Sequence, residues 1–131
     1  MKTILIALIT ICTLAISAVA QTTERLTLQP GKQVTSKKSK LKIKLVEVSE
    51  DSRCPTGAQC VWAGRAIIKL SVTSARMGTK VIEIDTSTGP QGDQFDGWAI
   101  SLESLTPHPN AGSAINSKAY RAKVTITRLQ R

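Results

Sequence analysis

The feature that most constrains the fold is an alternation of apolar and polar side chains in several short segments. In KLKIKLVEV, Leu41, Ile43 and Leu45 alternate with lysines, a period of two that a half-buried strand produces and a helix does not. The alternation changes phase at Leu45–Val46, where we expect a β-bulge or a twist. No segment of the sequence has a helical stripe of comparable length. The pattern therefore predicts an all-β protein.

Four further segments alternate in the same way: RAIIKLSVTS, KVIEID, WAISLESL and YRAKVTITRL. Their predicted inward positions are Ala66, Ile68, Leu70, Val72, Ile82, Ile84, Trp98, Ile100, Leu102, Tyr120, Ala122, Val124 and Ile126. We expect an initial pair of strands in RLTLQPGKQVTS, with a turn or bend at Pro30–Gly31. Connections rich in Gly, Pro and polar residues separate the strands, which is typical of a single antiparallel β-sandwich or a small open barrel.

The N-terminal segment MKTILIALITICTLAISAVA has the pattern of a secretory signal peptide. Lys2 precedes an apolar run, and the small residues of Ala18–Ala20 mark a cleavage site before Gln21. We expect residues 1–20 to be removed, which leaves residues 21–131 as a single secreted or periplasmic β-domain. The segment is followed by no basic stop-transfer flank, so we expect no transmembrane anchor.

The cysteines point to one disulfide. Cys12 lies in the predicted signal peptide, which leaves Cys54 and Cys60, an even number in an oxidising compartment. The two residues enclose the loop PTGAQ, in which a proline and a glycine help the chain to turn. A redox-active pair usually encloses two residues, and a zinc site would find only His108 as a further ligand of the usual kind. We therefore expect a structural disulfide, no metal and no cofactor.

The segment DSRCPTGAQCVWAG, followed by SLESLTPHPN and a terminal YRAKVTIT, resembles a family of small uncharacterised secreted or lipid-anchored bacterial proteins with a DSRCP-x4-CVWAG motif. The resemblance spans essentially the whole chain after the signal peptide. It implies a compact β-domain and a bacterial envelope or extracellular location, and it carries no catalytic residue. This chain lacks the anchoring cysteine of the lipid-anchored members, so the resemblance does not imply membrane attachment.

The candidate binding loop consists of four residues, Asp51, Arg53, Trp62 and His108. Asp51 and Arg53 can orient a ligand, although an ion pair that stabilises the loop is the more ordinary role. Trp62 can cover the loop or form part of a binding surface. His108 lies between two prolines and has no evident catalytic partner in the sequence.

Two aspartates in GDQFDGW, Asp93 and Asp96, can supply oxygen ligands to calcium. The ligand spacing of an EF-hand loop is absent, and an Asp-Gly pair is common in turns. We therefore expect a turn here rather than a metal site.

The charge balance is basic, with 18 Lys and Arg against 9 Asp and Glu, and only Lys2 belongs to the predicted signal peptide. Five lysines form a predicted ridge: Lys37, Lys38, Lys40, Lys42 and Lys44. Such a ridge can bind a polyanion, or it can keep an exposed edge strand from aggregating. The aromatic residues are few and are expected in the core, so we expect no specific recognition of nucleic acid.

These features favour a non-enzymatic binding or interaction module whose partner is an envelope or extracellular protein, a glycan or another polyanion. A protease-inhibitor-like domain is a specific version, because a loop closed by a disulfide suits that task. The alternative is a small hydrolase, for which Ser or Thr with Lys, or paired carboxylates, would supply the catalytic groups. No residue of the sequence is singled out as catalytic.

Overall fold

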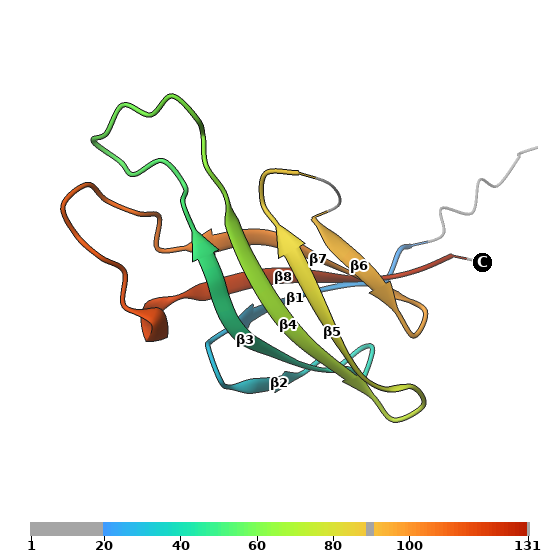
Figure 1. The fold of residues 1–131 in the computed structure, drawn as a ribbon. Helices are drawn as coiled ribbons and strands as arrows, with labels where there is room; N and C mark the ends of the chain where they lie inside the picture. Colours follow the sequence, from blue (N-terminus) through green and yellow to red (C-terminus); the bar gives the residue numbers. More distant parts are fainter. Residues whose placement is uncertain (1–19, 89–90, 131) are drawn as a thin grey trace, which may run out of the picture.

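The computed structural model describes residues 20–88 and 91–130, which form an antiparallel β-sandwich (Figure 1). One sheet contains, in order across it, β1 (Thr23–Leu28), β8 (Arg121–Arg128), β7 (Trp98–Thr106) and β6 (Gly92–Phe95). The other sheet contains β2 (Gln33–Thr35), β3 (Lys42–Asp51), β4 (Ala66–Ser74) and β5 (Gly78–Asp85). The sheets do not close into a barrel. The predicted all-β antiparallel sandwich with one short-loop disulfide is confirmed.

The two inner faces form one hydrophobic core. In β4 the even-numbered residues from Ala66 to Ser74 are buried, while the residues between them are partly exposed. The inward side chains of β8 are buried in the same way, and Trp98 and Tyr120 also lie in the core as predicted. Removal of these apolar side chains from water is the main source of stability in such a sandwich.

Bulges adjust the alternation in two strands. The register of β3 against β4 shifts just after Leu45, which confirms the bulge predicted there. The register of β7 against β8 shifts just after Leu102. Because of this extra residue, Leu102 is only half-buried, and Leu105 takes the buried position that strict alternation does not predict.

The predicted initial strand pair was wrong. β1 pairs with β8, and β2 pairs with β3, so the chain crosses from one sheet to the other between β1 and β2. Gly31, with a φ of 75°, lies at this crossing and donates its N–H to the Leu45 carbonyl at 2.9 Å. A Pro-Gly pair indicates a change of direction, but it does not determine which strand the chain pairs with next.

β6 lies in a segment that the sequence pattern assigns to a connection. Its four residues include one fully inward apolar side chain, Phe95, so the strand is too short for alternation to reveal it. Asp96 and Gly97, with φ values of 48° and 79°, form the tight turn between β6 and β7.

The predicted signal peptide, residues 1–20, lies outside the described residues except for Ala20. Within the part of the chain that the structure describes, no helix is long and apolar enough to cross a membrane. A short 3-10 turn, Ser117–Ala119, precedes β8.

Candidate functional site

Two loops extend together beyond one end of the sandwich (Figure 1). Residues 52–65 connect β3 to β4, and residues 107–120 connect β7 to β8. We call these two segments the two-loop end. The Thr56 N–H donates to the Pro109 carbonyl at 2.9 Å, and the Ala111 N–H donates to the Thr56 carbonyl at 3.1 Å. The backbones of the two loops therefore support each other.

The first loop is closed at its base by the predicted disulfide. Cys54 and Cys60 are bonded to each other, with their Cα atoms 5.9 Å apart. The Cys54 N–H donates to the Ala63 carbonyl at 2.9 Å, and the Ser52 N–H donates to the Arg65 carbonyl at 2.7 Å. These contacts continue the β3–β4 ladder into the loop, so the loop leaves the sandwich in a fixed direction.

Arg53 connects the two loops through its guanidinium group. Its Nε and Nη2 atoms donate to the two carboxylate oxygens of Asp51 at 2.7 Å each. Its Nη1 and Nη2 atoms also donate to the carbonyls of Leu105 at 2.8 Å and Pro107 at 2.9 Å. The side chains of Arg53 and Asp51 are only 13% and 9% exposed. A bidentate pair shielded in this way holds a more definite geometry than a surface ion pair.

Tyr120 completes the contacts of Asp51, because its hydroxyl donates to the Asp51 carboxylate at 2.8 Å. Burial alone would raise the pKa of Asp51, but the hydrogen bonds from Arg53 and Tyr120 and the Arg53 charge hold that pKa below its usual range. Burial, the hydrogen bond to Asp51 and the negative charge of Asp51 raise the pKa of Tyr120 to about 12. At neutral pH the carboxylate is charged and the phenol is neutral.

His108 lies at the same base, with its Nε2 atom 2.7 Å from the carbonyl oxygen of Cys54. Since a carbonyl only accepts, the tautomer with a proton on Nε2 satisfies this contact. Three of the four predicted binding-loop residues, Asp51, Arg53 and His108, thus use their polar groups within the protein. Through these contacts they position the two loops.

Gly64 is a further residue on which the base of the loop depends. Its φ of 68° lies in the left-handed region, and a Cβ atom at this position would lie 1.7 Å from the Ser52 carbonyl oxygen. Glycine alone permits both features. The sequence shows Gly64 next to Trp62, but the approach of Ser52 follows from the fold and has no local signal.

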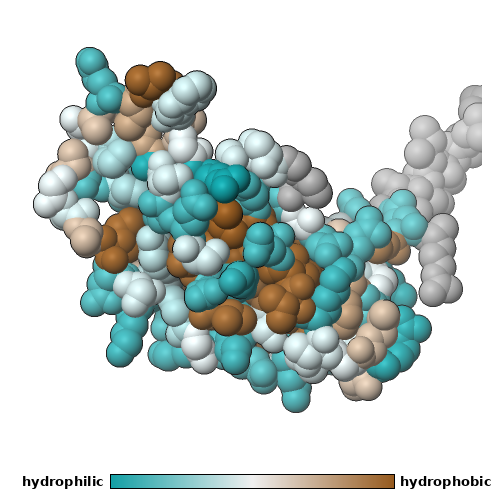
Figure 2. Space-filling view, in the orientation of Figure 1, coloured by the Kyte–Doolittle hydropathy of each residue, from teal (hydrophilic) through white to brown (hydrophobic). Residues whose placement is uncertain are grey.

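Trp62, the fourth predicted residue, is located differently. Its surface is 81% exposed, and that of its neighbour Val61 is 89% exposed. Figure 2 shows a small hydrophobic area at the outer end of this part of the molecule. The sequence has no ionisable side chain from Cys54 to Gly64 or from Pro109 to Ser117. The tip of the two-loop end is therefore uncharged and exposes Val61 and Trp62 beside neutral polar side chains, on a base fixed by hydrogen bonds and a disulfide.

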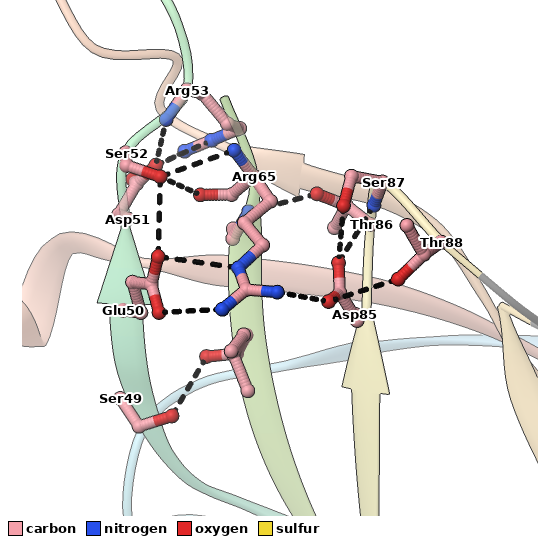
Figure 3. A network of polar contacts seen from close by, with 12 residues as sticks. Ser49, Glu50, Asp51, Ser52, Arg53, Arg65, Asp85, Thr86, Ser87 and Thr88 are labelled. Carbon is pink, nitrogen blue, oxygen red and sulfur yellow. Dashed lines mark hydrogen bonds and ion pairs between the residues drawn. The ribbon is translucent and has the colours of Figure 1, made fainter. Parts of the chain in front are cut away.

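Arg65 forms a second polar network beside the first loop (Figure 3). It donates to Glu50 at 3.3 Å and to Asp85 at 3.0 Å, so it joins β3 and β5 across β4. The backbone N–H and hydroxyl of Ser87, then the Thr88 hydroxyl and the Arg65 charge, lower the pKa of Asp85 to about 2. Arg65 separates the two carboxylates and pairs with both, which does not give the arrangement of a general acid and base.

Of the five predicted ridge lysines, Lys42 and Lys44 lie on the outer face of β3, whereas Lys40 lies in the preceding turn with a φ of 62°. The cross-strand neighbours of this pair on the outer face are hydroxyl or amide residues: Gln33, Thr35, Ser71 and Thr73. The interpretation of an edge strand was wrong here, because β2 pairs with β3 along Lys42–Lys44.

Lys37 and Lys38 belong to a turn held by Glu24 of β1. Their N–H groups donate to the Glu24 carboxylate at 3.1 and 3.0 Å, and the Lys38 ammonium donates to the Thr23 carbonyl at 2.7 Å. Partial burial raises the pKa of Glu24, but the Ser36 hydroxyl and these N–H groups outweigh it and hold the pKa below its usual range. The five lysines therefore come from two places, the turn before β3 and the outer face of β3 itself.

The two aspartates considered as calcium ligands both form ion pairs with basic side chains. Asp93 pairs with Lys80 at 2.6 Å, and Asp96 pairs with Arg76. Among residues 20–88 and 91–130, no three His, Cys, Asp or Glu side chains gather in a way that would hold a metal ion.

Comparison of the chain with models of protein families, with curated proteins and with solved structures finds no match. The resemblance carried by the DSRCP-x4-CVWAG motif stays a prediction. The functional argument therefore rests on the geometry of the two-loop end.

Proposed function

We propose that the protein is a secreted or periplasmic binding protein that inserts Val61 and Trp62 into an apolar recess on a protein partner. The observation that carries this proposal is the exposure of these two side chains on a loop whose base is fixed. Tryptophan is among the residues that contribute most to protein interfaces when it enters a pocket. A single exposed tryptophan in a flexible loop would be much weaker evidence for a binding site.

The fixed base lowers the entropy lost on binding. Arg53, the disulfide and the contact of His108 with Cys54 already hold the loops in one arrangement. Binding then needs to order only the side chains at the tip, and such preorganisation increases affinity without additional contacts.

The shape and charge of the tip indicate the kind of partner. Two narrow loops that extend beyond the sandwich form a convex surface, which fits a concave one (Figure 2). Because the tip has no ionisable side chain, the matching recess should be apolar with uncharged hydrogen-bonding groups at its rim. The substrate cleft of a secreted enzyme has this form, so an inhibitor-like role is one version of the proposal.

The test is affinity capture from the envelope and medium of the producing cell, followed by a binding measurement with the purified partner. We expect Trp62→Ala to weaken the affinity by about tenfold or more, as for a central interface residue. Val81→Ala is the matched control, because Val81 is 61% exposed on β5, away from the tip. Unchanged affinity of Trp62→Ala for the purified partner would contradict the proposal.

A second function is supported by the arrangement of Lys42 and Lys44. Two ammonium groups beside hydroxyl and amide side chains on an open sheet face can bind the charged groups of a polyanion. We propose weak, sequence-independent binding of polyanions at this face as the second candidate.

A further inference from the structure

A cleft lies beside the start of β1. This is the end of the sandwich opposite the two-loop end (Figure 1). Ala20, Gln21 and Thr22, the residues just before β1, line one part of it. The β6–β7 turn, the end of β8 and the β4–β5 turn supply its remaining side chains, which include Asp96, Trp98, Arg128 and Arg76.

The chain is attached to the sandwich from Thr22 onward. The Arg128 N–H donates to the Thr22 carbonyl at 2.9 Å, and β1 begins at Thr23. Gln21 is exposed, and its carboxamide makes no hydrogen bond to another residue that the structure describes. Cleavage after Ala20 would leave Gln21 as the only residue before the attached chain, with its new α-amino group at the cleft.

We propose that Gln21 is converted to pyroglutamate once the signal peptide is removed, and that the resulting ring forms the N-terminal wall of the cleft. The inference rests on the secreted location in the proposed function, because it requires cleavage after Ala20. It assigns a modification to the end of the molecule that does not contact the proposed partner.

The reaction is an internal transfer of the side-chain acyl group. The neutral α-amino nitrogen attacks the Cδ atom of the carboxamide, and a lactam ring closes as the bond from Cδ to Nε2 breaks. The leaving nitrogen takes up the proton that the amine releases and departs as ammonia. No oxidant, reductant or further reactant is required.

The charges around the cleft favour this reaction. Asp96 is already paired with Arg76, and the Arg128 guanidinium lies over the Trp98 ring at 5.6 Å from its centroid. An α-ammonium group at Gln21 would therefore share the cleft with two guanidinium groups and one engaged carboxylate. Like charges disfavour the ammonium form and favour the neutral amine, which is the nucleophile. The lactam removes the unfavourable charge altogether.

The experiment is mass spectrometry of the N-terminal peptide of the full chain, produced with its own leader and purified from the exported fraction. We expect a peptide that begins at residue 21 and is lighter by one ammonia than the unmodified sequence. The Gln21→Ser variant should begin at the same residue with its unmodified mass. An intact Gln21 after incubation at neutral pH, or a terminus at any other residue, would overturn the inference. Binding by Trp62→Ala is a separate measurement, so failure of cyclisation alone leaves the proposed function standing.

A second variant tests the contribution of the cleft. Arg76→Gln removes the partner of Asp96, so the carboxylate becomes available to hold the α-amino group as an ammonium ion. We expect the time course of ammonia loss after export to become several-fold slower than in the wild type. Equal rates would overturn the role assigned to the cleft charges.

Discussion

Tyr120 is the only tyrosine in the chain, so its titration can be measured without interference from another phenol. Burial, the hydrogen bond to Asp51 and the Asp51 charge raise its pKa from 10.0 to about 12. We expect the absorbance of tyrosinate in the folded protein to appear with a midpoint near 12, and in denaturant near 10. Asp51→Asn should lower the folded midpoint, because it removes the negative charge. A folded midpoint equal to that in denaturant would contradict the Tyr120–Asp51 contact.

The same shift affects stability at high pH. The folded pKa of Tyr120 lies above the unfolded value, so its contribution to the free energy of unfolding is fully present below about pH 10 and is lost as the pH rises through about 12. Tyr120→Phe should lack this part of the alkaline loss. Urea unfolding of both proteins across that pH range measures the difference.

At the scale of residues, the sequence predicts contacts between near neighbours but not contacts that the fold creates. The pairing of Arg53 with Asp51 follows from their closeness in the chain. The bonds from Arg53 to the carbonyls of Leu105 and Pro107 do not, because the two loops meet only after both sheets have formed. The sequence also does not predict whether Trp62 is exposed. The backbone of the folded loop sets the direction of this side chain.

In β4, two adjacent residues test the assignment of the inner face. Ile68 is fully buried between the sheets, whereas Lys69 lies on the outer face and pairs with Glu47 at 2.8 Å. Ile68→Lys should prevent folding, because it places an unpaired charge in the core. Lys69→Gln should change the free energy of unfolding very little, as expected for an exposed ion pair. Circular dichroism and denaturant unfolding decide this, and similar effects of the two substitutions would contradict the assignment.

In the first loop, the disulfide should stabilise the protein only moderately. For a loop this short, the chain-entropy model gives about 2 kcal/mol. Cys54→Ser/Cys60→Ser should lower the free energy of unfolding by about this amount and leave the β-sheet spectrum unchanged, because Arg53 still joins the loops. Thiol labelling of the exported wild-type protein should find no free cysteine. Free, reactive thiols in that protein would contradict the structural role of the pair.

At the scale of elements, strands with several inward apolar residues could be predicted from the sequence. In β4 and β8, buried apolar residues alternate with more exposed ones over most of the strand, because one face packs in the core. β6 could not be predicted in this way, because Phe95 alone marks its inner face. The partners of β1 and β2 could not be predicted either, since alternation reports which face is buried but contains no information about the neighbouring strand.

At the scale of the whole molecule, the full sequence has a net charge of +9, which attracts anions in general, so a specific binding face must be separated from this effect. Lys42→Gln/Lys44→Gln and Lys118→Gln/Lys123→Gln remove the same charge from different places, since Lys123 lies in β8 on the other sheet. A difference between these two variants therefore reports position, while an equal loss reports net charge.

The measurement is a salt titration of binding to dextran sulfate by the wild type and both variants. We expect the wild type to bind at low ionic strength and to lose affinity steeply as salt is added, because each contact releases counterions. Lys42→Gln/Lys44→Gln should bind more weakly and lower the steepness of the logarithmic salt dependence by about two units, one for each lost contact. Lys118→Gln/Lys123→Gln should change that steepness much less, and all three proteins should unfold at similar denaturant concentrations. If the two variants weaken equally, or if the wild type does not bind even at low salt, Lys42 and Lys44 do not form a polyanion-binding face, and their role is limited to solubility.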